Sequence, residues 1–427
     1  MLRILFVHNF YQQPGGEDAV FRAERDLLRA HGHPVETLEF HNDGIGGGFG
    51  SRLLAGLRGF YNSGSARRLR AAIRAFRPDV IHIHNLFPVG SPALLYAARA
   101  AGVPVVMTLH NYRLICPGAL LYTDGKLYEA SVHRLFPWDA IRRRLYRNSA
   151  LQTATVAAIT GVHKLLGTWR RGVARYLVLT EFARQRYLNS SLRPRPGQLV
   201  FKPNFLVDPG APDASVARAG HLLFVGRLSP EKGLQTLLAA AAAHALPLVV
   251  VGDGPLRAEV EACAAATPSV RYQGPADAAG VVAAMRRCRA LVMPSECVEG
   301  MPMVVLEAFA TGTPVLAARR GGPGEMVQPG VNGFLFEPGD AQGLAEAARH
   351  LLIDPDLAAH LGRAARVSYE TLYTPARNYS SLLGIYQEVV AEAHGVSARA
   401  APVAAPPDPA ASDSALPCAT HQAPSSA

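Results

Sequence analysis

The sequence predicts an α/β protein built from two doubly wound domains, each a parallel β-sheet covered by helices, that face each other across a cleft. Short runs rich in Val, Ile and Leu alternate with longer helical patterns, as expected of strands that are buried on both faces. The chain has 427 residues, which is too long for one compact core. The alternation also restarts midway, because HLLFVGRL resembles the opening strand RILFVH.

The strands can be assigned in order from these apolar runs. The first half contains RILFVH, PVETLEF, VIHIH, VPVVMTLH and RYLVLT, and helical patterns over 19–31, 66–76 and 92–101 lie between them. The second half continues after HLLFVGRL with LPLVVVGDG, VRYQG, ALVMP, TPVLAA and GFLFEP. In sheets of this kind, ligands bind outside the carboxyl ends of the strands. The cleft between the two domains is therefore the expected site.

Composition sets the limits of the predicted domains. Residues 1–205 form the first domain, a linker rich in Pro, Gly and Asp covers 206–218, and the second domain covers 219–375. A helix is expected over 376–396. The Ala/Pro/Ser-rich segment 397–427 has too little apolar surface to order itself, and it is predicted to be a disordered tail.

Charge and cysteine content restrict the partners and the compartment. The net charge of +10 favours anionic partners: phosphorylated small molecules, lipid surfaces or nucleic acid. No nucleic-acid-binding motif occurs, so we expect no nucleic-acid partner. Five scattered cysteines without a CxxC pair argue against a disulfide framework or structural zinc site and fit a reducing compartment. No signal peptide or membrane span is evident, which predicts a cytoplasmic protein.

Two segments suggest phosphate binding. Gly15 and Gly16 lie where the first strand gives way to a helix, and a helix N-terminus favours a phosphate. The spacing is not GxGxxG, and an ordinary loop glycine pair explains it equally well. In FVGRLSPEKG, Arg227 and Lys232 flank a turn and could clamp a pyrophosphate through charge-assisted hydrogen bonds. Two surface cations around a capped helix start are the alternative.

Histidines follow two of the predicted strands. His110 ends VPVVMTLH, while His82 and His84 lie in VIHIH. A histidine at a strand end can donate a hydrogen bond to a sugar hydroxyl, and its charge is tunable near neutral pH. A structural histidine is the alternative at each position.

The stretch SECVEGMPMVVLEAFATGTPV contains two carboxylates, Glu299 and Glu307. Pro302 is expected in the first turn of a helix, which places Glu299 in the preceding loop and Glu307 in the second turn. A carboxylate can accept hydrogen bonds from two vicinal hydroxyls, as in a ribose or a hexose. For Glu307 the alternative is an ordinary solvated helix edge.

Together these segments resemble retaining glycosyltransferases of the GT-B fold, glycosyltransferase family 4, of the bacterial type that builds surface glycans. The resemblance covers nearly the whole chain before the tail. It rests on the glycine pair, GRLSPEKG, the two glutamates, and GTPVLAARRGGPGE followed by GVNGFLFEPGD. TLHNYRLICPGALLYTDGK is also similar to that branch. The fold implied is two Rossmann-like domains facing a cleft.

The resemblance implies the transfer of a sugar from a UDP- or GDP-linked donor to a glycan or polyprenyl-linked acceptor, with retained configuration, no cofactor and no metal. Arg227 and Lys232 would bind the diphosphate, His110 and Glu299 would contact the donor sugar, and Glu307 would hold the ribose. The other implied donor-binding residues are Gly15, Gly16, Gly226, Gly300, Met301, Pro302 and Met303. The helix over 376–396 would cross back to the first domain. The usual Phe-Gly of the family is replaced here by Met301-Pro302.

One basic segment suggests a membrane contact. HRLFPWDAIRRRLYRNSA interleaves five arginines, from Arg134 to Arg147, with Trp138 and other apolar residues. Such a patch suits peripheral binding to the inner face of the cell membrane, and a solvated basic helix is the alternative.

Two other functions compete with transfer. One is a non-catalytic GT-B subunit that binds a nucleotide-sugar, and degraded clamp residues would mark it. The second is another GT-B-like enzyme, either a sugar-nucleotide epimerase, which would lack the GRLSPEKG clamp, or a phosphorylase, which would need a lysine for pyridoxal phosphate.

Overall fold

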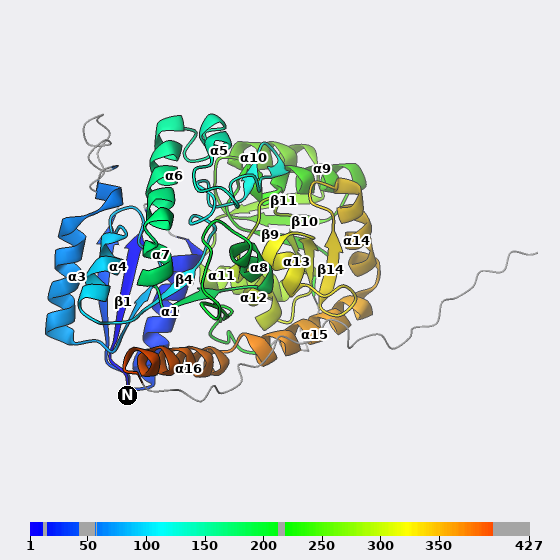
Figure 1. Ribbon diagram of the computed structural model, residues 1–427. Helices are drawn as coiled ribbons and strands as arrows, with labels where there is room; N and C mark the ends of the chain where they lie inside the picture. The colour runs from blue at the N-terminus through cyan, green and yellow to red at the C-terminus, as the bar shows by residue number, and fades with distance from the viewer. Residues whose placement is uncertain (12–14, 42–55, 57, 212–217, 396–427) are drawn as a thin grey trace, which may run out of the picture.

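The computed structural model describes residues 1–11, 15–41, 56, 58–211 and 218–395. It contains two six-stranded parallel sheets with helices packed against them (Figure 1). Part of the predicted linker and the whole predicted tail lie outside the described residues.

The first sheet has the strand order β2-β1-β3-β4-β7-β8. Its strands are β1 (Ile4–Phe10), β2 (Val35–His41), β3 (Val80–Ile83), β4 (Val105–Leu109), β7 (Arg175–Val178) and β8 (Leu199–Phe201). Every pairing is parallel, and Ile4 to Phe10 of β1 run in register with Val35 to His41 of β2. Parallel pairing places the carboxyl ends of these strands at one edge of the sheet.

Successive side chains of β1 point to opposite faces of this sheet. Leu5 and Val7 pack into one core with α3 (Ser63–Phe76) and α4 (Ala93–Ala100). Ile4 and Phe6 pack into another with α1 (Gly16–Ala30) and α16 (Pro375–Ala393). Burial on both faces explains why the strand sequences are continuously apolar.

The second sheet has the order β11-β10-β9-β12-β13-β14. Its strands are β9 (Leu222–Val225), β10 (Leu248–Val251), β11 (Val270–Gly274), β12 (Ala290–Met293), β13 (Val315–Ala318) and β14 (Gly333–Phe336). This is the order of the nucleotide-binding doubly wound fold, in which the crevice forms where the strand order reverses. Here that switch point lies between β9 and β12.

The remaining helices connect these strands. In the first domain they are α5 (Trp138–Arg142), α6 (Ala150–Leu165), α7 (Thr168–Gly172) and α8 (Glu181–Leu188), with a small hairpin of β5 (Tyr122–Thr123) and β6 (Lys126–Leu127). In the second they are α9 (Leu234–His244), α10 (Arg257–Ala266), α11 (Ala278–Arg287), α12 (Met303–Ala310), α13 (Gly321–Met326), α14 (Ala341–Ile353) and α15 (Pro355–Leu372), with the short 3-10 helix η1 (Pro230–Lys232). Side-chain N-caps begin several of them, for example Asp354 of α15 and Thr374 of α16.

The last helix, α16, extends along the lower edge of the molecule to the first domain (Figure 1). Leu382, Ile385 and Val389 join the core behind the first sheet. The hydroxyl of Tyr386 lies 2.6 Å from Nδ1 of His82. The chain thus returns to the first domain after completing the second.

Two further contacts join the domains near the cleft. The Glu325 carboxylate of α13 accepts hydrogen bonds from the backbone N–H groups of Glu181 (2.8 Å) and Phe182 (2.7 Å), and so caps α8. The Tyr122 hydroxyl donates to Glu296 (3.2 Å). Across the part of the chain that the structure describes, no helix has both the length and the apolar content that a membrane crossing requires.

Candidate active site

A pocket of about 350 Å³ lies between the domains at the carboxyl ends of both sheets. Both domains contribute to its wall, which places the predicted residues of the two halves at one site. From the predicted set it is lined by Gly15, Gly16, His110, Gly226, Lys232, Glu299, Gly300, Met301, Pro302 and Met303.

The glycine pair brings the first domain against the second. A Cβ on Gly16 would lie 3.6 Å from Cγ of Met303, so the loop is in near contact with the start of α12. Asp18 fixes this loop, because its carboxylate accepts a hydrogen bond from the backbone N–H of Gly15 (3.0 Å) and contacts Nε2 of His8 (2.7 Å). The N-terminus of α1 thus borders the pocket, where a helix favours an anion.

Lys232 and Glu299 form an ion pair inside this pocket. Nζ of Lys232 lies 2.6 Å from Oε1 of Glu299, which also accepts a hydrogen bond from Ser295 (3.0 Å). Burial disfavours the charged form of Lys232, but the Glu299 charge and hydrogen bond outweigh it and raise the pKa of Lys232. Burial likewise favours neutral Glu299, yet the charge of Lys232 and the hydrogen bonds lower the pKa of that carboxyl. Both groups are therefore charged at neutral pH.

A glycine is required next to Lys232. Gly233 has φ +67°, and a Cβ there would lie 1.9 Å from the carbonyl oxygen of Pro294. Any side chain would both strain the backbone and collide with that carbonyl. The close approach packs the turn that carries Lys232 against the loop that carries Glu299.

Arg227 and Glu307 are not among the residues that line the pocket. Arg227 is exposed and follows Gly226, which does line it. Glu307 is half-buried on α12, where burial raises the pKa of its carboxyl. Its side chain makes no hydrogen bond or ion pair with any residue in the described ranges. Arg227 follows Gly226 directly and Glu307 lies three positions after Val304, which also lines the pocket, but neither Arg227 nor Glu307 is part of the wall itself.

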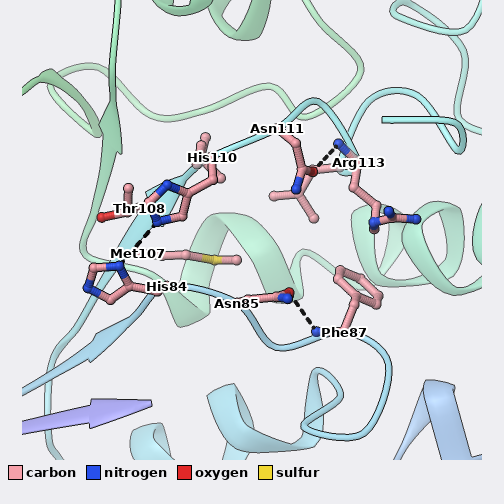
Figure 2. A pocket seen from close by; sticks show the side chains of 10 residues that line it. His84, Asn85, Phe87, Met107, Thr108, His110, Asn111 and Arg113 are labelled. Atoms are coloured by element: carbon pink, nitrogen blue, oxygen red, sulfur yellow. Dashed lines mark hydrogen bonds between the residues drawn. The ribbon is translucent and has the colours of Figure 1, made fainter. Parts of the chain in front are cut away.

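The three histidines singled out in the sequence analysis form one cluster, in which His82 and His84 are buried and His110 is half-buried. Nε2 of His110 lies 3.1 Å from Nδ1 of His84 (Figure 2). His82 is held between the Tyr386 hydroxyl (2.6 Å) and the Thr108 hydroxyl (2.8 Å). Burial, together with neighbouring histidine and lysine charges, lowers the pKa of His82 and His84 well below the usual range and that of His110 to about 3. All three are neutral at physiological pH.

A buried glutamate borders this cluster. Oε2 of Glu24 lies 3.4 Å from Nε2 of His84, but neither atom has a hydrogen-bond partner among the described residues. Nδ1 of His84 and Nε2 of His110 share one proton, so one of these nitrogens donates and the other accepts.

Glu24, His82 and His84 place their ligand atoms within 4.8 Å of one another, as in a metal site. However, the ammonium group of Lys202 already pairs with Oε1 of Glu24, and both ring nitrogens of His82 have partners. A second positive charge would repel that ammonium. The donor set therefore fits the buried ion pair better than a cation.

Comparisons with known proteins agree with this architecture. Residues 14–204 match the family described as Glycosyl transferase 4-like domain, and residues 216–368 match Glycosyl transferases group 1. The GDP-mannose-dependent alpha-mannosyltransferase of Mycolicibacterium smegmatis is 30% identical over 76% of this chain and 77% of its own length. This chain belongs to glycosyltransferase family 4. The predicted family is confirmed.

Other relatives of this chain are longer. Sulfoquinovosyl transferase SQD2 of Arabidopsis thaliana is 28% identical over 71% of this chain, and the match spans 55% of the plant protein. Glycogen synthase of Mycobacterium tuberculosis (strain CDC 1551 / Oshkosh) is 31% identical over 69% of this chain and 64% of its own length. The chain thus spans little more than half to two thirds of these two relatives.

Solved structures confirm the predicted GT-B fold. Sucrose-phosphate synthase from Thermosynechococcus elongatus superposes with a TM-score of 0.67 at 19% identity, over 91% of this chain and 100% of that one. Anabaena HepE in complex with UDP-glucose superposes with a TM-score of 0.63 at 19% identity, over 91% and 100% of the two chains.

The Met301-Pro302 pair of this chain has a structural role. The sulfur of Met301 lies 3.1 Å from the backbone nitrogen of Asn204, which lines the pocket from the segment that leaves the first domain. Pro302 is the N-cap residue of α12 and has no N–H of its own. The variant pair thus fixes the connecting segment against the start of this helix.

Sequence reasoning missed two features of the site. Glu17, directly after the glycine pair, lines the pocket, and its position in the sequence was the only available signal. The GGPGE segment supports the loop that carries Glu299, because the backbone N–H of Gly322 donates to the Glu299 carbonyl (2.9 Å). A Cβ on Gly322 would lie 2.0 Å from the carbonyl oxygen of Gly300, so only glycine fits there.

Proposed function

We propose that this glycosyltransferase moves a hexosyl group from a UDP- or GDP-linked donor to a hydroxyl of a glycan or polyprenyl-linked acceptor, with retention of configuration. The observation that carries the proposal is the charged pair of Lys232 and Glu299 in a pocket that both domains line. HepE, a protein of the same fold, has been solved with UDP and glucose, which supports a nucleotide-sugar donor.

The diphosphate of the donor is proposed to bind beside Lys232. Its ammonium group would then exchange part of its contact with Glu299 for the phosphates, and Arg227 would supply a second charge from the adjoining turn. The amide groups at the start of α12 and the Gly15–Gly16 loop border the same space. Preorganised charge of this kind stabilises a nucleoside diphosphate as it leaves. In this proposal Lys232 and Arg227 neutralise the charge of the leaving diphosphate, a role that a metal ion can fill in other enzymes.

The remaining donor contacts follow from position. Glu307, on the second turn of α12, is proposed to accept hydrogen bonds from the ribose hydroxyls. Glu299 and the neutral ring of His110 are proposed to meet hydroxyls of the donor sugar. Burial of the neutral imidazole suits this role, because a charged ring would lose its lone pair.

Retention is proposed to follow from attack on the face that the leaving group occupies. The bond between the anomeric carbon and the phosphate oxygen breaks while a bond to the acceptor oxygen forms. The proton of the acceptor hydroxyl passes to an oxygen of the departing phosphate. No side-chain nucleophile is needed.

A lipid-linked acceptor would fit the surface of α5 and α6. Trp138 is 68% exposed and Leu151 is 62% exposed. Four arginines beside Trp138 are also exposed, namely Arg142, Arg143, Arg144 and Arg147. Arginine with exposed aromatic and aliphatic side chains is typical of contact with anionic lipid. We propose that this face lies on the inner surface of the cell membrane.

Thermal unfolding with a panel of UDP-, GDP- and ADP-sugars tests the proposal. A donor should raise the melting temperature, because ligand binding to the folded state stabilises it. The Lys232→Ala variant should lose that shift. A chain that responds to no nucleotide-sugar would contradict the proposed function. A chain that binds one without turning it over would support the non-catalytic alternative.

A further inference from the structure

The two residues proposed to contact the donor sugar come from different domains and lie on segments that pack against each other. His110 follows β4 of the first domain, and Glu299 lies in the loop before α12 of the second. The backbone N–H of Val298 donates a hydrogen bond to the carbonyl oxygen of Leu120 (3.1 Å). A Cβ on Gly300 would lie 3.1 Å from the carbonyl oxygen of His110. The geometry of the sugar site therefore depends on what holds these two segments together.

Helix α8 holds the segment that carries His110. Tyr187 of α8 is buried, and its hydroxyl donates a hydrogen bond to the carbonyl oxygen of Asn111 (2.6 Å). Asn111 directly follows His110 (Figure 2). The ring of Tyr187 also stacks on that of Tyr112, with the ring centroids 5.9 Å apart. The position of α8 therefore fixes the backbone next to His110.

The turn before α8 reaches into the second domain. Leu179 is 3% exposed and lines the donor pocket. It belongs to the apolar core that Met301 and Val305 share, and the other buried members of that core come from the second domain. Thr180, the next residue, is the N-cap of α8. The N-terminus of this helix therefore lies at the boundary between the domains.

The second domain holds α8 at this end through Glu325. Its carboxylate accepts hydrogen bonds from the N–H groups of Glu181 (2.8 Å) and Phe182 (2.7 Å). These N–H groups have no partner within the helix, and the positive end of the helix dipole favours a carboxylate. Glu325 lies on α13, where the N–H of Gly322 donates to the carbonyl oxygen of Glu299 (2.9 Å). The short helix α13 thus contacts both α8 and the Glu299 loop.

We propose that Glu325 is a positioning residue for the transfer reaction. By capping α8, it holds His110 of the first domain opposite Glu299 of the second, so that both can meet the donor sugar. The inference rests on the proposed function, because it concerns how the same donor site is assembled. Glu325 is not among the residues that line the pocket, so it acts through α8 and Tyr187. The nucleotide is proposed to bind chiefly at the second domain, and its affinity should not depend on Glu325.

A proline substitution can remove one of the two capped N–H groups. Glu181 is the first residue of α8, a position that accepts proline. The preceding Thr180 is extended, with φ −142° and ψ 156°, as a residue before proline prefers. Glu181→Pro therefore removes a donor to Glu325 and leaves the helix intact. Glu181→Ala is the matched control, because it keeps the N–H and loses the same side-chain contacts with Arg184 and Gln185.

The test measures two quantities on each variant: release of the nucleoside diphosphate from UDP-glucose, UDP-galactose and GDP-mannose in water, and affinity for UDP and GDP by calorimetry. Glu325→Ala should lower kcat by about threefold to tenfold, a modest loss because Glu325 is exposed to solvent. Glu325→Gln keeps an accepting oxygen and should lose less. The nucleotide Kd should change less than about twofold in both. Glu261→Ala, at an exposed pair with Arg257 on α10, should leave both quantities unchanged.

A double-mutant cycle tests whether Glu325 acts through α8. In the wild-type background, Glu181→Pro should have a kcat about twofold to fivefold below that of Glu181→Ala. In the Glu325→Ala background, the two substitutions at position 181 should give equal kcat values, because the carboxylate that uses this N–H is gone.

Three results would overturn the inference. A kcat of Glu325→Ala equal to that of wild type would exclude a positioning role. A loss of nucleotide affinity as large as the loss of kcat would show a general effect on the second domain instead. Independent, additive effects of Glu325→Ala and Glu181→Pro would show that Glu325 does not act through α8. A wild type that neither binds nor hydrolyses any of the donors would instead contradict the proposed function itself, so the two failures are distinguishable.

Discussion

Replacing Glu24 by glutamine should destabilise the first domain strongly. Glu24 and Lys202 form an ion pair with side chains that are 0% and 1% exposed. The amide of Asn378 on α16 contacts both Oε1 of Glu24 (3.5 Å) and the carbonyl oxygen of Pro203 (3.4 Å). The pair thus joins α1, the end of β8 and the returning helix. Removing the carboxylate leaves the ammonium group buried without a counter-charge.

The cost follows from that burial. Loss of one partner of a buried pair costs about 3 to 5 kcal/mol, and we expect about 3 kcal/mol here because the glutamine oxygen can still accept a hydrogen bond. Adding Lys202→Met should restore more than half of the loss, since the unpaired charge is then gone. Asp26→Asn, at an exposed pair on the same helix, should cost less than about 1 kcal/mol.

The assay can report on this domain alone. Both tryptophans of the chain, Trp138 and Trp169, lie in the first domain, and Trp169 is buried. Urea unfolding followed by tryptophan fluorescence therefore measures the first domain. A loss in Glu24→Gln no larger than in Asp26→Asn would refute the reasoning. So would a double variant that is less stable than the single one.

Further expectations concern the ribose contact, pH and the membrane. Glu307→Ala should weaken UDP or GDP binding by roughly 10- to 100-fold in calorimetry. Glu346→Ala, on the exposed side of α14, should leave this binding unchanged. Equal nucleotide affinities of wild type and Glu307→Ala would contradict the ribose role. The free energy of unfolding should fall as the pH is lowered from 7 to 5. The reason is that the unfolded chain gains protons on histidines that the fold keeps neutral. His110, with a pKa of about 3, accounts for roughly 2 kcal/mol of this loss. A pH-independent value would show that these rings are charged. Trp138→Ala should reduce sedimentation with phosphatidylserine vesicles. Ile353→Ala, at a residue of the second domain that is even more exposed, should leave sedimentation intact. Unchanged sedimentation in Trp138→Ala would exclude the proposed membrane face.

Much of the fold was accessible from sequence, because strands buried on both faces are continuous apolar runs. RILFVH and HLLFVG correspond to β1 and β9, the first strands of the two sheets. The strand β8 (Leu199–Phe201) was missed, since it is three residues long and lies among prolines and glycines that read as a linker. Its pairing with β7 is a tertiary contact, which the local pattern of apolar residues does not predict.

The sequence predicted individual residues of the site but not the contacts between them. Lys232 and Glu299 were assigned to different parts of the donor, and the sequence did not indicate that they pair across 67 positions. The histidines were noticed at their strand ends. The carboxylate beside them was not, because Glu24 lies on an amphipathic helix where a glutamate normally faces water. In the fold, Glu24 faces His82 and His84 of the β3 segment and Lys202, and α16 covers it through Asn378.

The proposed retaining transfer is tested most directly by the anomer that forms first. Proton NMR during hydrolysis of an α-linked UDP-hexose or GDP-hexose, with water as the acceptor, records the free hexose before it mutarotates. The account predicts the α-anomer first from wild type, and a rate at least roughly 100-fold lower from Lys232→Ala. An initial β-anomer, or a Lys232→Ala variant as fast as wild type, would contradict it.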